Sequence, residues 1–243
     1  MSGVHTHSTS RPCCAIEHTE TVENYLKAIF TLTASGEPAS TAAIAERLHV
    51  AAPSVSAMIG RLRVGDLIQQ ATWGHVLLTE HGMTHARSVV RRHRLLETFL
   101  HQALGLGWDE VHAEAEVLEH RLSERVEDLI DAALGFPDRD PHGDPIPAKT
   151  GLHLENQELP LASAVPGDQF LVQRVSDHDG AALRRLAHLG IGPGTELDVE
   201  QFSTDTGVMS VRATGEVRSL SGTLVGVIRG RVVASISTTG RPS

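Results

Sequence analysis

The chain has 243 residues, which is long enough for two or three domains with hydrophobic cores of their own. Its formal net charge of −9 argues against nucleic-acid binding by bulk electrostatics, and no apolar run approaches the length of a membrane span. The only cysteines, Cys13 and Cys14, are adjacent and pair poorly, so we expect no disulfide framework. The N-terminal residues lack the hydrophobic stretch of a signal peptide, and we expect a cytoplasmic protein.

Residues 1–19 are polar and lack hydrophobic periodicity, which predicts a disordered tail. The side chains of metal-binding types in this tail are His5, His7, Cys13, Cys14 and His18. An unstructured segment in which these types occur by chance is the favoured interpretation.

Residues 20–82 carry the pattern of a winged helix-turn-helix. Apolar residues recur at helical spacing from Val22 onwards, which predicts a first helix that ends before Gly36. Ser40 is a good N-terminal cap for a short second helix. A turn then leads to Pro53, whose fixed φ suits the first turn of a third helix.

The third helix is the one expected to enter a major groove of DNA. Helical spacing turns Val55, Met58, Ile59 and Leu62 toward the core, so the other residues of this helix point outward. The residues predicted to contact bases or phosphates are Pro53, Ser54, Ser56, Ala57, Arg61 and Arg63.

Two short apolar strands around a tip at Trp73 and Gly74 follow directly, which predicts a wing. Whether Trp73 contacts DNA or packs against the protein stays open. Residues 1–80 contain only five Lys and Arg against seven Asp and Glu. We therefore expect DNA binding to be intrinsically weak and to depend on something that organises it.

A long helix is predicted over residues 80–104, followed by a helix capped at Asp109 that runs to about Arg121. Ser123 opens a further helix, which ends at Gly135 before a turn-rich segment.

Histidine and glutamate recur at helical intervals on the first two of these helices. They are His93, Glu97, His112, Glu116, Glu119 and His120. Residues three or four apart lie on one face of a helix, so the long helix has one edge of ligands and the next helix has a stripe. Imidazole and carboxylate together suit a first-row divalent cation. This pattern after a helix-turn-helix indicates a metal-sensing regulator.

Residues 148–165 are predicted to be a linker, after which the pattern changes to short β-rich runs. The predicted strands are QFLVQRV, TELDVEQF, VMSVRA, EVRSL, TLVGVIRG and VVASIS, interrupted by a small helix from Ala181 to Leu189. Short strands with Gly turns predict a small β-barrel over residues 166–243. The expected fold class is mainly α with a β-rich C-terminal part.

Four segments in this order resemble the diphtheria toxin repressor family of metal-dependent regulators: TVENYLKAIF, IAERLHVAAPSVSAMIGRL, RRHRLLETFL through WDEVHAEAEVLEHRLS, and PHGDPIP. The segment LRRLAHLGIGPGTELDV resembles the FeoA-type, SH3-like domain of longer members. The resemblance implies a helical dimerisation and metal-binding domain over residues 83–147. It also implies double-stranded operator DNA and a second copy of the chain as partners, repression of metal-uptake genes, and neither a membrane nor a small organic substrate.

The resemblance also implies two metal sites. Carried over by position, the primary site falls on Asn24, Glu116, Glu119 and His120. The ancillary site falls on His93, Glu97 and His112, with a contribution from the segment SDHDGAAL. In that segment Asp179 is favoured over Asp177 and His178.

Two positions bear on the metal. Glu116 stands where iron-responsive members carry Cys. A hard oxygen ligand favours Mn²⁺. Fe²⁺ is the alternative, because ligand type biases metal selectivity without settling it. Asn24 stands where manganese-type members often carry Asp, and its amide oxygen coordinates without adding charge. The expected mechanism is an ion held jointly by Asn24 and the second ligand helix. This ion orients the winged helix-turn-helix domain over residues 20–82, here called the reading head, on a pseudo-palindromic operator. Because the ion needs neutral His120, sensing should fail at low pH.

Two other classes of function are weighed. EVLEH is similar to zinc-peptidase motifs, but HxxEH requires His where this chain has Glu116, and HExxH is not met either. An enzyme is therefore disfavoured. The rival of another class is a FeoA-like adaptor whose C-terminal barrel binds a protein partner.

Overall fold

The computed structural model describes residues 17, 19–70, 74–149 and 158–235. The predicted N-terminal tail, except for positions 17 and 19, and the wing residue Trp73 lie outside these ranges. The chain divides into two compact units, Met1–Val90 and Arg91–Ser243. Among the described residues, no helix combines the length and hydrophobicity that a membrane crossing needs.

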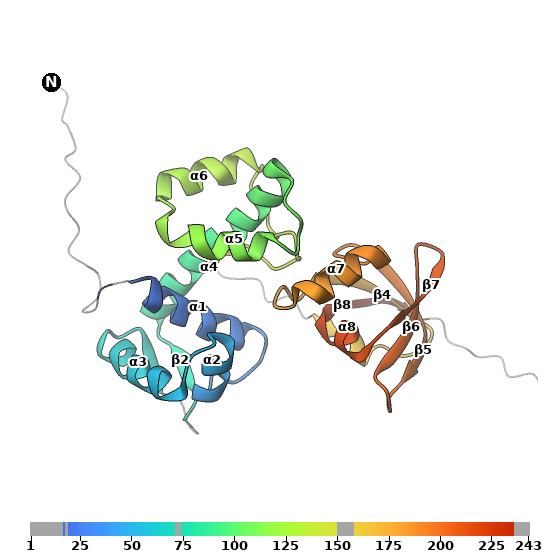
Figure 1. Ribbon diagram of the computed structural model, residues 1–243, viewed down its shortest axis with the longest axis horizontal. Helices are drawn as coiled ribbons and strands as arrows, with labels where there is room; N and C mark the ends of the chain where they lie inside the picture. Colours follow the sequence, from blue (N-terminus) through green and yellow to red (C-terminus); the bar gives the residue numbers. More distant parts are fainter. Residues whose placement is uncertain (1–16, 18, 71–73, 150–157, 236–243) are drawn as a thin grey trace, which may run out of the picture. The chain divides into compact units, whose positions relative to one another are not determined.

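The N-terminal unit is a winged helix-turn-helix, which confirms the prediction (Figure 1). The hydroxyls of Thr19 and Ser40 cap the first two helices by accepting hydrogen bonds from backbone N–H groups. The wing is a two-stranded antiparallel hairpin. The elements are α1 (Glu20–Ala34), α2 (Thr41–Arg47), α3 (Ala52–Val64), β1 (Ile68–Gln70) and β2 (Val76–Leu78).

The core of this unit forms because α3 turns one face inward. Val55, Met58 and Leu62 are buried against apolar residues of α1 and α2, as helical spacing predicts. Burying each such side chain contributes roughly 1.5–3 kcal/mol, which holds the outward face of α3 in a fixed orientation. The helix that follows, α4 (Glu80–Leu104), adds Ala86 and Val90 to the same core.

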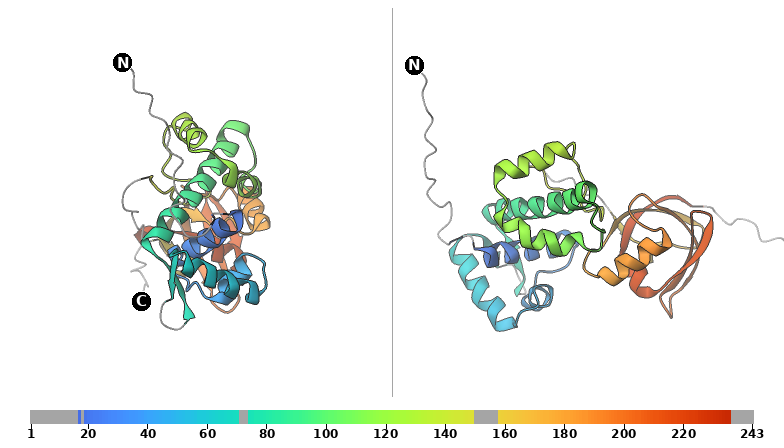
Figure 2. Two further views of the ribbon diagram at one scale, coloured as in Figure 1. Left: turned by 90° about the vertical axis from the view of Figure 1, so that its left-hand side faces the viewer. Right: turned by 45° about the horizontal axis from the view of Figure 1, so that its top comes forward.

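Helix α4 continues into the second unit, where it lies alongside two shorter helices (Figure 2). Leu95 and Leu96 of α4 share a small core with Ala115 and Ile130. The N-cap of the second helix is Glu110 and not Asp109 as predicted. The Asp109 carboxylate forms an ion pair with Arg184. These helices are α5 (Val111–Leu118), the 3₁₀ turn η2 (Glu119–Arg121) and α6 (Glu124–Ala133).

The C-terminal part is a six-stranded antiparallel sheet in the order β3-β8-β4-β5-β6-β7, with two helices packed on it. The sheet is curved like a small barrel but is not closed, because β3 and β7 are its two edges. The strands are β3 (Leu159–Pro160), β4 (Asp168–Val175), β5 (Glu196–Ser203), β6 (Val208–Ala213), β7 (Glu216–Leu220) and β8 (Ile228–Ser235). The helices are α7 (Gly180–Leu189), α8 (Gly222–Val227) and the 3₁₀ turn η3 (Leu161–Ser163).

Two sequence predictions differ from this sheet. The run TLVGVIRG was predicted to be one strand, but its first half is the helix α8, which buries Leu224 and Val225 against the sheet. The predicted linker over 148–165 contains β3 and η3, whose Leu161 is fully buried. Apolar runs this short fit either a strand or a buried helix, so periodicity alone does not separate the two.

A close backbone contact fixes the start of α4 against Leu67, the residue that precedes β1. A Cβ added at Gly82 would lie 1.8 Å from the carbonyl oxygen of Leu67, whereas one added at Gly60 would meet nothing within 4 Å. Gly82→Ala should therefore lower the free energy of unfolding by roughly 1–3 kcal/mol through overpacking. Gly60→Ala, in the interior of α3, should raise it by up to about 1 kcal/mol. Chemical denaturation measures both, and equal effects of the two changes would contradict the contact.

Candidate metal centre

The predicted ligand stripe is divided between a regular helix and a tighter turn. His112 and Glu116 lie on α5, whereas Glu119 and His120 lie on η2. A 3₁₀ turn has about 3.0 residues per turn, so it rotates adjacent side chains further than an α-helix does. The Glu119 side chain is fully buried and the His120 imidazole is 4% exposed, whereas the Glu116 side chain is 37% exposed.

His93 of α4 lies at the middle of the ligand set. Its Nδ1 is 2.5 Å from Oε2 of Glu119, and its Nε2 is 3.0 Å from Oε1 of Glu97. The two carboxylates are fully buried. The ligand atoms of His93, Glu116 and Glu119 all lie within 4.8 Å of one another. His93 therefore joins the two groups of residues that the family resemblance assigns to separate sites.

A second group forms around His112, where the C-terminal part of the chain contributes a carboxylate. Nδ1 of His112 is 2.9 Å from Oδ2 of Asp177 and 3.2 Å from Oε1 of Glu97. Burial lowers the pKa of His112, but the hydrogen bonds and charges of Asp177 and Glu97 outweigh that effect and raise it to about 10. The four ligand atoms of His93, Glu97, His112 and Asp177 lie within 4.8 Å of one another.

The C-terminal carboxylate in this group is Asp177 and not Asp179, which the sequence favoured. Asp179 is the N-cap of α7, and its carboxylate accepts hydrogen bonds from the backbone N–H groups of Ala181 and Ala182. That capping role turns its side chain along the helix axis. Both aspartates stand in the same short loop, so their spacing in sequence does not separate a cap from a ligand.

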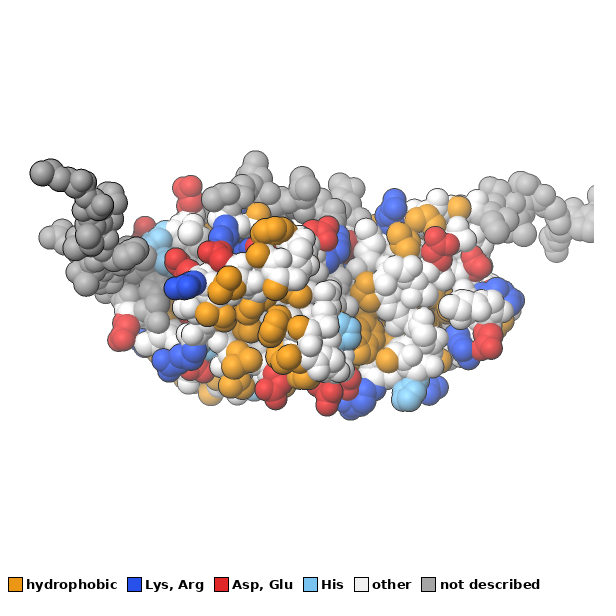
Figure 3. All heavy atoms as spheres, turned by 90° about the horizontal axis from the view of Figure 1, so that it is seen from above, with side chains coloured by type: hydrophobic (Ala, Val, Ile, Leu, Met, Phe, Trp, Pro, Cys, Tyr) orange, Lys and Arg blue, Asp and Glu red, His pale blue; other side chains and the backbone are white. Residues whose placement is uncertain are grey.

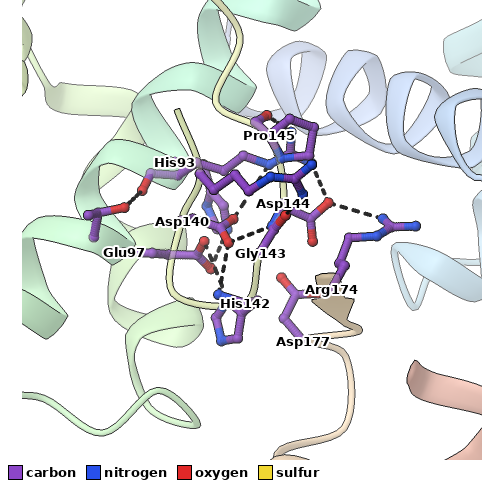
Figure 4. Close-up of polar contacts among 12 residues, drawn as sticks. His93, Glu97, Asp140, His142, Gly143, Asp144, Pro145, Arg174 and Asp177 are labelled. Atoms are coloured by element: carbon purple, nitrogen blue, oxygen red, sulfur yellow. Dashed lines mark hydrogen bonds and ion pairs between the residues drawn. The ribbon is translucent and has the colours of Figure 1, made fainter. Parts of the chain in front are cut away.

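A third group contains two residues that sequence reasoning missed, Asp140 and His142 (Figure 4). Their ligand atoms lie within 4.8 Å of a ligand atom of Glu97 and of each other. The His142 ring is fully buried and stacks on Trp108, and its Nε2 is 2.6 Å from the Trp108 carbonyl oxygen. These residues lie in a turn-rich loop, which has no periodicity to mark a shared face. The available signal was a His two positions after an Asp.

Concentrated negative charge dominates the electrostatics of these groups. Burial raises the pKa of Glu97, but the imidazoles of His93, His112 and His142 hold it well below its usual range. The pKa of Asp140 is raised well above its usual range by burial and by the carboxylates of Glu97 and Asp144. Burial lowers the pKa of His142, but Glu97 and Asp140 outweigh that effect and raise it to about 9. Protons therefore occupy the His112 and His142 imidazoles at neutral pH when no cation is bound.

The remaining predicted primary ligand, Asn24, lies on α1 in the N-terminal unit. Its Oδ1 is buried and has no hydrogen-bond partner among the residues that the structure describes. An orphaned buried amide oxygen costs about 1–3 kcal/mol, and a cation ligated there would remove that cost. The side chains of the three groups are oxygen and nitrogen donors, of which His112, Glu116 and Asp177 are only partly buried, and this is the donor set that a divalent first-row cation takes. The residues present therefore fit such an ion.

The predicted DNA-reading residues all lie on the outer face of α3. The helix begins at Ala52 with a proline in its first turn, and its buried face is Val55, Met58 and Leu62. The exposed residues include every one predicted to contact DNA: Pro53, Ser54, Ser56, Ala57, Arg61 and Arg63. This face is available to a groove of DNA.

Three protein-family models match the chain in order. They are described as the iron dependent repressor N-terminal DNA binding domain, over residues 17–76, and the iron dependent repressor metal binding and dimerisation domain, over residues 79–148. The third is the FeoA domain, over residues 159–231.

Characterised proteins and a solved structure are similar over most of their lengths. The iron-dependent repressor IdeR of Mycobacterium tuberculosis is 35% identical over 199 residues, which cover 76% of this chain and 85% of that protein. The diphtheria toxin repressor of Corynebacterium diphtheriae is 33% identical over 184 residues, which cover 76% of this chain and 77% of that protein. A manganese-dependent transcriptional repressor, solved in complex with manganese, has a TM-score of 0.83 and 41% identity, and the match covers 87% of this chain and all of that one.

Proposed function

The chain belongs to the diphtheria toxin repressor family of metal-dependent transcriptional repressors, and from this premise we propose that Mn²⁺ is the metal that activates it. The observation that carries the choice of metal is the donor set. Glu116 joins His93 and Glu119 as a carboxylate, and both cysteines lie outside the described residues, far along the chain from these ligands. Oxygen donors favour hard ions such as Mn²⁺, whereas thiolate favours softer ions.

The relatives support both metals by name. A similar solved structure is a manganese-dependent repressor, whereas the relatives from Mycobacterium and Corynebacterium include proteins named iron-dependent repressor and diphtheria toxin repressor. Fe²⁺ is thus the alternative activator within the same function. Metal preference follows from the ligands more directly than from overall identity, because a single ligand exchange changes the donor chemistry.

The proposed primary ligands are Asn24, Glu116, Glu119 and His120. A bound divalent cation supplies positive charge that offsets the carboxylates and satisfies the Asn24 oxygen. Because Asn24 belongs to the reading head and the other three residues belong to the second unit, shared ligation restricts the orientation of the reading head. Allosteric coupling of this kind is typically about 1–3 kcal/mol, or roughly 5- to 150-fold in affinity. Because the reading head has so few Lys and Arg residues, such a factor is large enough to separate bound from free operator.

The dimer that reads a pseudo-palindromic operator is proposed to form through the helices of the second unit. Hydrophobic side chains gather on one face of this helical region (Figure 3). The exposed apolar residues there are Val117, Leu118, Val126, Leu129 and Phe136. A contiguous apolar patch on a soluble protein marks an interaction surface, and the matching family model describes this region as a dimerisation domain. Two copies would then present two α3 helices to successive turns of one groove.

Metal-dependent operator binding tests the central proposal. A DNA duplex selected from a random library by the wild-type protein in Mn²⁺ serves as operator. Glu116→Ala and His120→Ala should each reduce Mn²⁺-dependent binding by at least 5-fold, because each removes a ligand that shares the ion with the reading head. Glu114→Ala, at an exposed position on the same helix, is the matched control and should bind as wild type does. Equal, metal-independent binding by all four proteins would reject the mechanism.

The choice of metal is tested by changing one donor atom. Glu116→Cys should shift the activating metal from Mn²⁺ toward Fe²⁺ or Zn²⁺, because a thiolate is a softer ligand than a carboxylate. The measurement is the concentration of each metal that gives half-maximal operator binding under anaerobic conditions. Glu114→Cys controls for the added thiol. Unchanged preference in the Glu116 variant would remove the argument for manganese.

The dimer surface is tested by placing a charge in the apolar patch. Leu129, 61% exposed on α6, should tolerate Glu in the folded monomer, while a buried charge at the interface should shift the equilibrium toward monomer. Sedimentation velocity measures the shift for Leu129→Glu. The control is Val217→Glu, at an exposed position on β7. Should both variants sediment as wild type does, the interface lies elsewhere.

A further inference from the structure

Glu97 lies between two groups of ligands and presents a different oxygen to each. Its Oε1 is 3.0 Å from Nε2 of His93 and 3.2 Å from Nδ1 of His112. Its Oε2 is 3.8 Å from Nδ1 of His142. Figure 4 shows the Glu97 carboxylate beside His142 and Asp140, which lie on the loop that passes it. A carboxylate with one oxygen in each of two donor sets is placed to bridge two cations.

The side of this centre that faces the loop contains two unsatisfied atoms. Oε2 of Glu97 and Nδ1 of His142 are both buried, and neither has a hydrogen-bond partner among the described residues. They form a long ion pair, because their separation of 3.8 Å is too great for a hydrogen bond. Bonds from first-row cations to oxygen or nitrogen are about 2.0–2.2 Å long, so one ion can contact two atoms up to about 4.4 Å apart. The gap between these atoms has the width that a shared ion requires.

The other groups on the loop already have partners. Oδ1 of Asp140 accepts hydrogen bonds from the backbone N–H groups of His142 and Asp144, both at 2.9 Å. The Asp144 carboxylate pairs with Arg94 at 3.0 Å and with Arg174 at 3.1 Å. Oδ2 of Asp140 forms a long ion pair with Nε of Arg94 at 3.7 Å and can also bind a cation. The unsatisfied atoms are thus confined to the point where the Glu97 and His142 side chains meet.

We propose that Glu97 bridges two divalent cations, the first held with His93, His112 and Asp177 and the second held with Asp140 and His142. The inference rests on the proposed function, since it adds a second ion to a centre that the family resemblance treats as a site for one. Three carboxylates then face four positive charges, and the orphaned Oε2 and Nδ1 atoms both become ligands. The ions would be of the same class that activates the protein, because the donors are again carboxylate and imidazole.

The loop that supplies the second set of ligands is pressed onto the C-terminal sheet. Gly143 has a φ of +88°, and a Cβ there would lie 2.0 Å from the carbonyl oxygen of Gln173. The backbone N–H of Val175 donates to the His142 carbonyl oxygen at 2.9 Å. Asp177, a ligand of the first set, follows the same strand β4. Occupancy of both positions therefore requires the sheet to be docked against the loop, so the bridged pair would join the FeoA-type part to the ligand helices.

The bridge is tested by measuring how many Mn²⁺ ions each chain binds and whether two of them are close enough for exchange coupling. The full-length protein is dialysed to equilibrium against Mn²⁺, and bound metal is measured together with the electron paramagnetic resonance spectrum. Wild type should give the spectrum of an exchange-coupled Mn²⁺ pair. His142→Gln should bind one ion fewer per chain and lose that coupled signal. His188→Gln, at an exposed position on α7, should match wild type in both measurements.

A second variant covers the case in which His142→Gln fails to fold. Asp140→Asn retains the Oδ1 atom that accepts the two backbone hydrogen bonds, so the loop keeps its shape while one charged ligand is lost. It should also lose one ion and the coupled signal, with the near-ultraviolet circular dichroism of the metal-free protein unchanged. Wild-type metal content in either folded variant, or a wild-type spectrum of isolated Mn²⁺ ions only, would overturn the bridge.

Failure of the bridge is distinguishable from failure of the proposed function. Glu116→Ala should lose Mn²⁺-dependent operator binding while it keeps the coupled signal, because Glu116 lies outside the bridged set. Operator binding that ignores metal in wild type, accompanied by a coupled signal, would reject the function and keep the bridge. Metal-dependent operator binding without a coupled signal would do the reverse.

Discussion

The structure of the second unit depends on carboxylates buried beside imidazoles. Glu97 and Glu119 have no exposed surface, and the ring of His93 lies between them with short contacts to both. Burying two carboxylates this close is costly unless protons or a cation offset the charge. The His112 and His142 imidazoles supply that charge through raised pKa values, so a metal ion that bound here would replace protons. A metal response at this site would therefore depend on the packing of α4 against α5.

The reading head shows the opposite arrangement, in which apolar packing stabilises the fold and polar groups lie at the surface. Val55, Met58 and Leu62 anchor α3, and its outer face carries mainly small residues. This face has few Lys and Arg residues to attract DNA, so DNA binding depends more on the orientation of the domain than on its charge. A single amide on α1, Asn24, is the group by which the ligand set and this head would communicate. The division of labour explains why an acidic protein can be a DNA-binding repressor.

Helical periodicity predicted most of what lies on regular helices. The α3 face, the His93–Glu97 edge and the bounds of α4 and α7 follow from apolar spacing and caps, which are local properties of the chain. The loop ligands Asp140 and His142 did not follow, because their approach to Glu97 is set by tertiary contacts of a loop without periodicity. The prediction of Asp179 in place of Asp177 as the ligand is wrong for a similar reason, since both residues lie in a loop. Only the geometry of the α7 start decides which aspartate caps the helix and which reaches His112.

Trp108 provides a natural optical probe of this assembly. Its indole packs against the hydrophobic core of the C-terminal sheet and stacks on His142, so it contacts the sheet and the ligand loop at once. The sequence has one other tryptophan, Trp73. Release of the sheet would hydrate the Trp108 ring and move its fluorescence to longer wavelength, while an ion at His142 would alter quenching by the stacked imidazole. The emission of one native side chain thus reports sheet docking and metal occupancy without any added label.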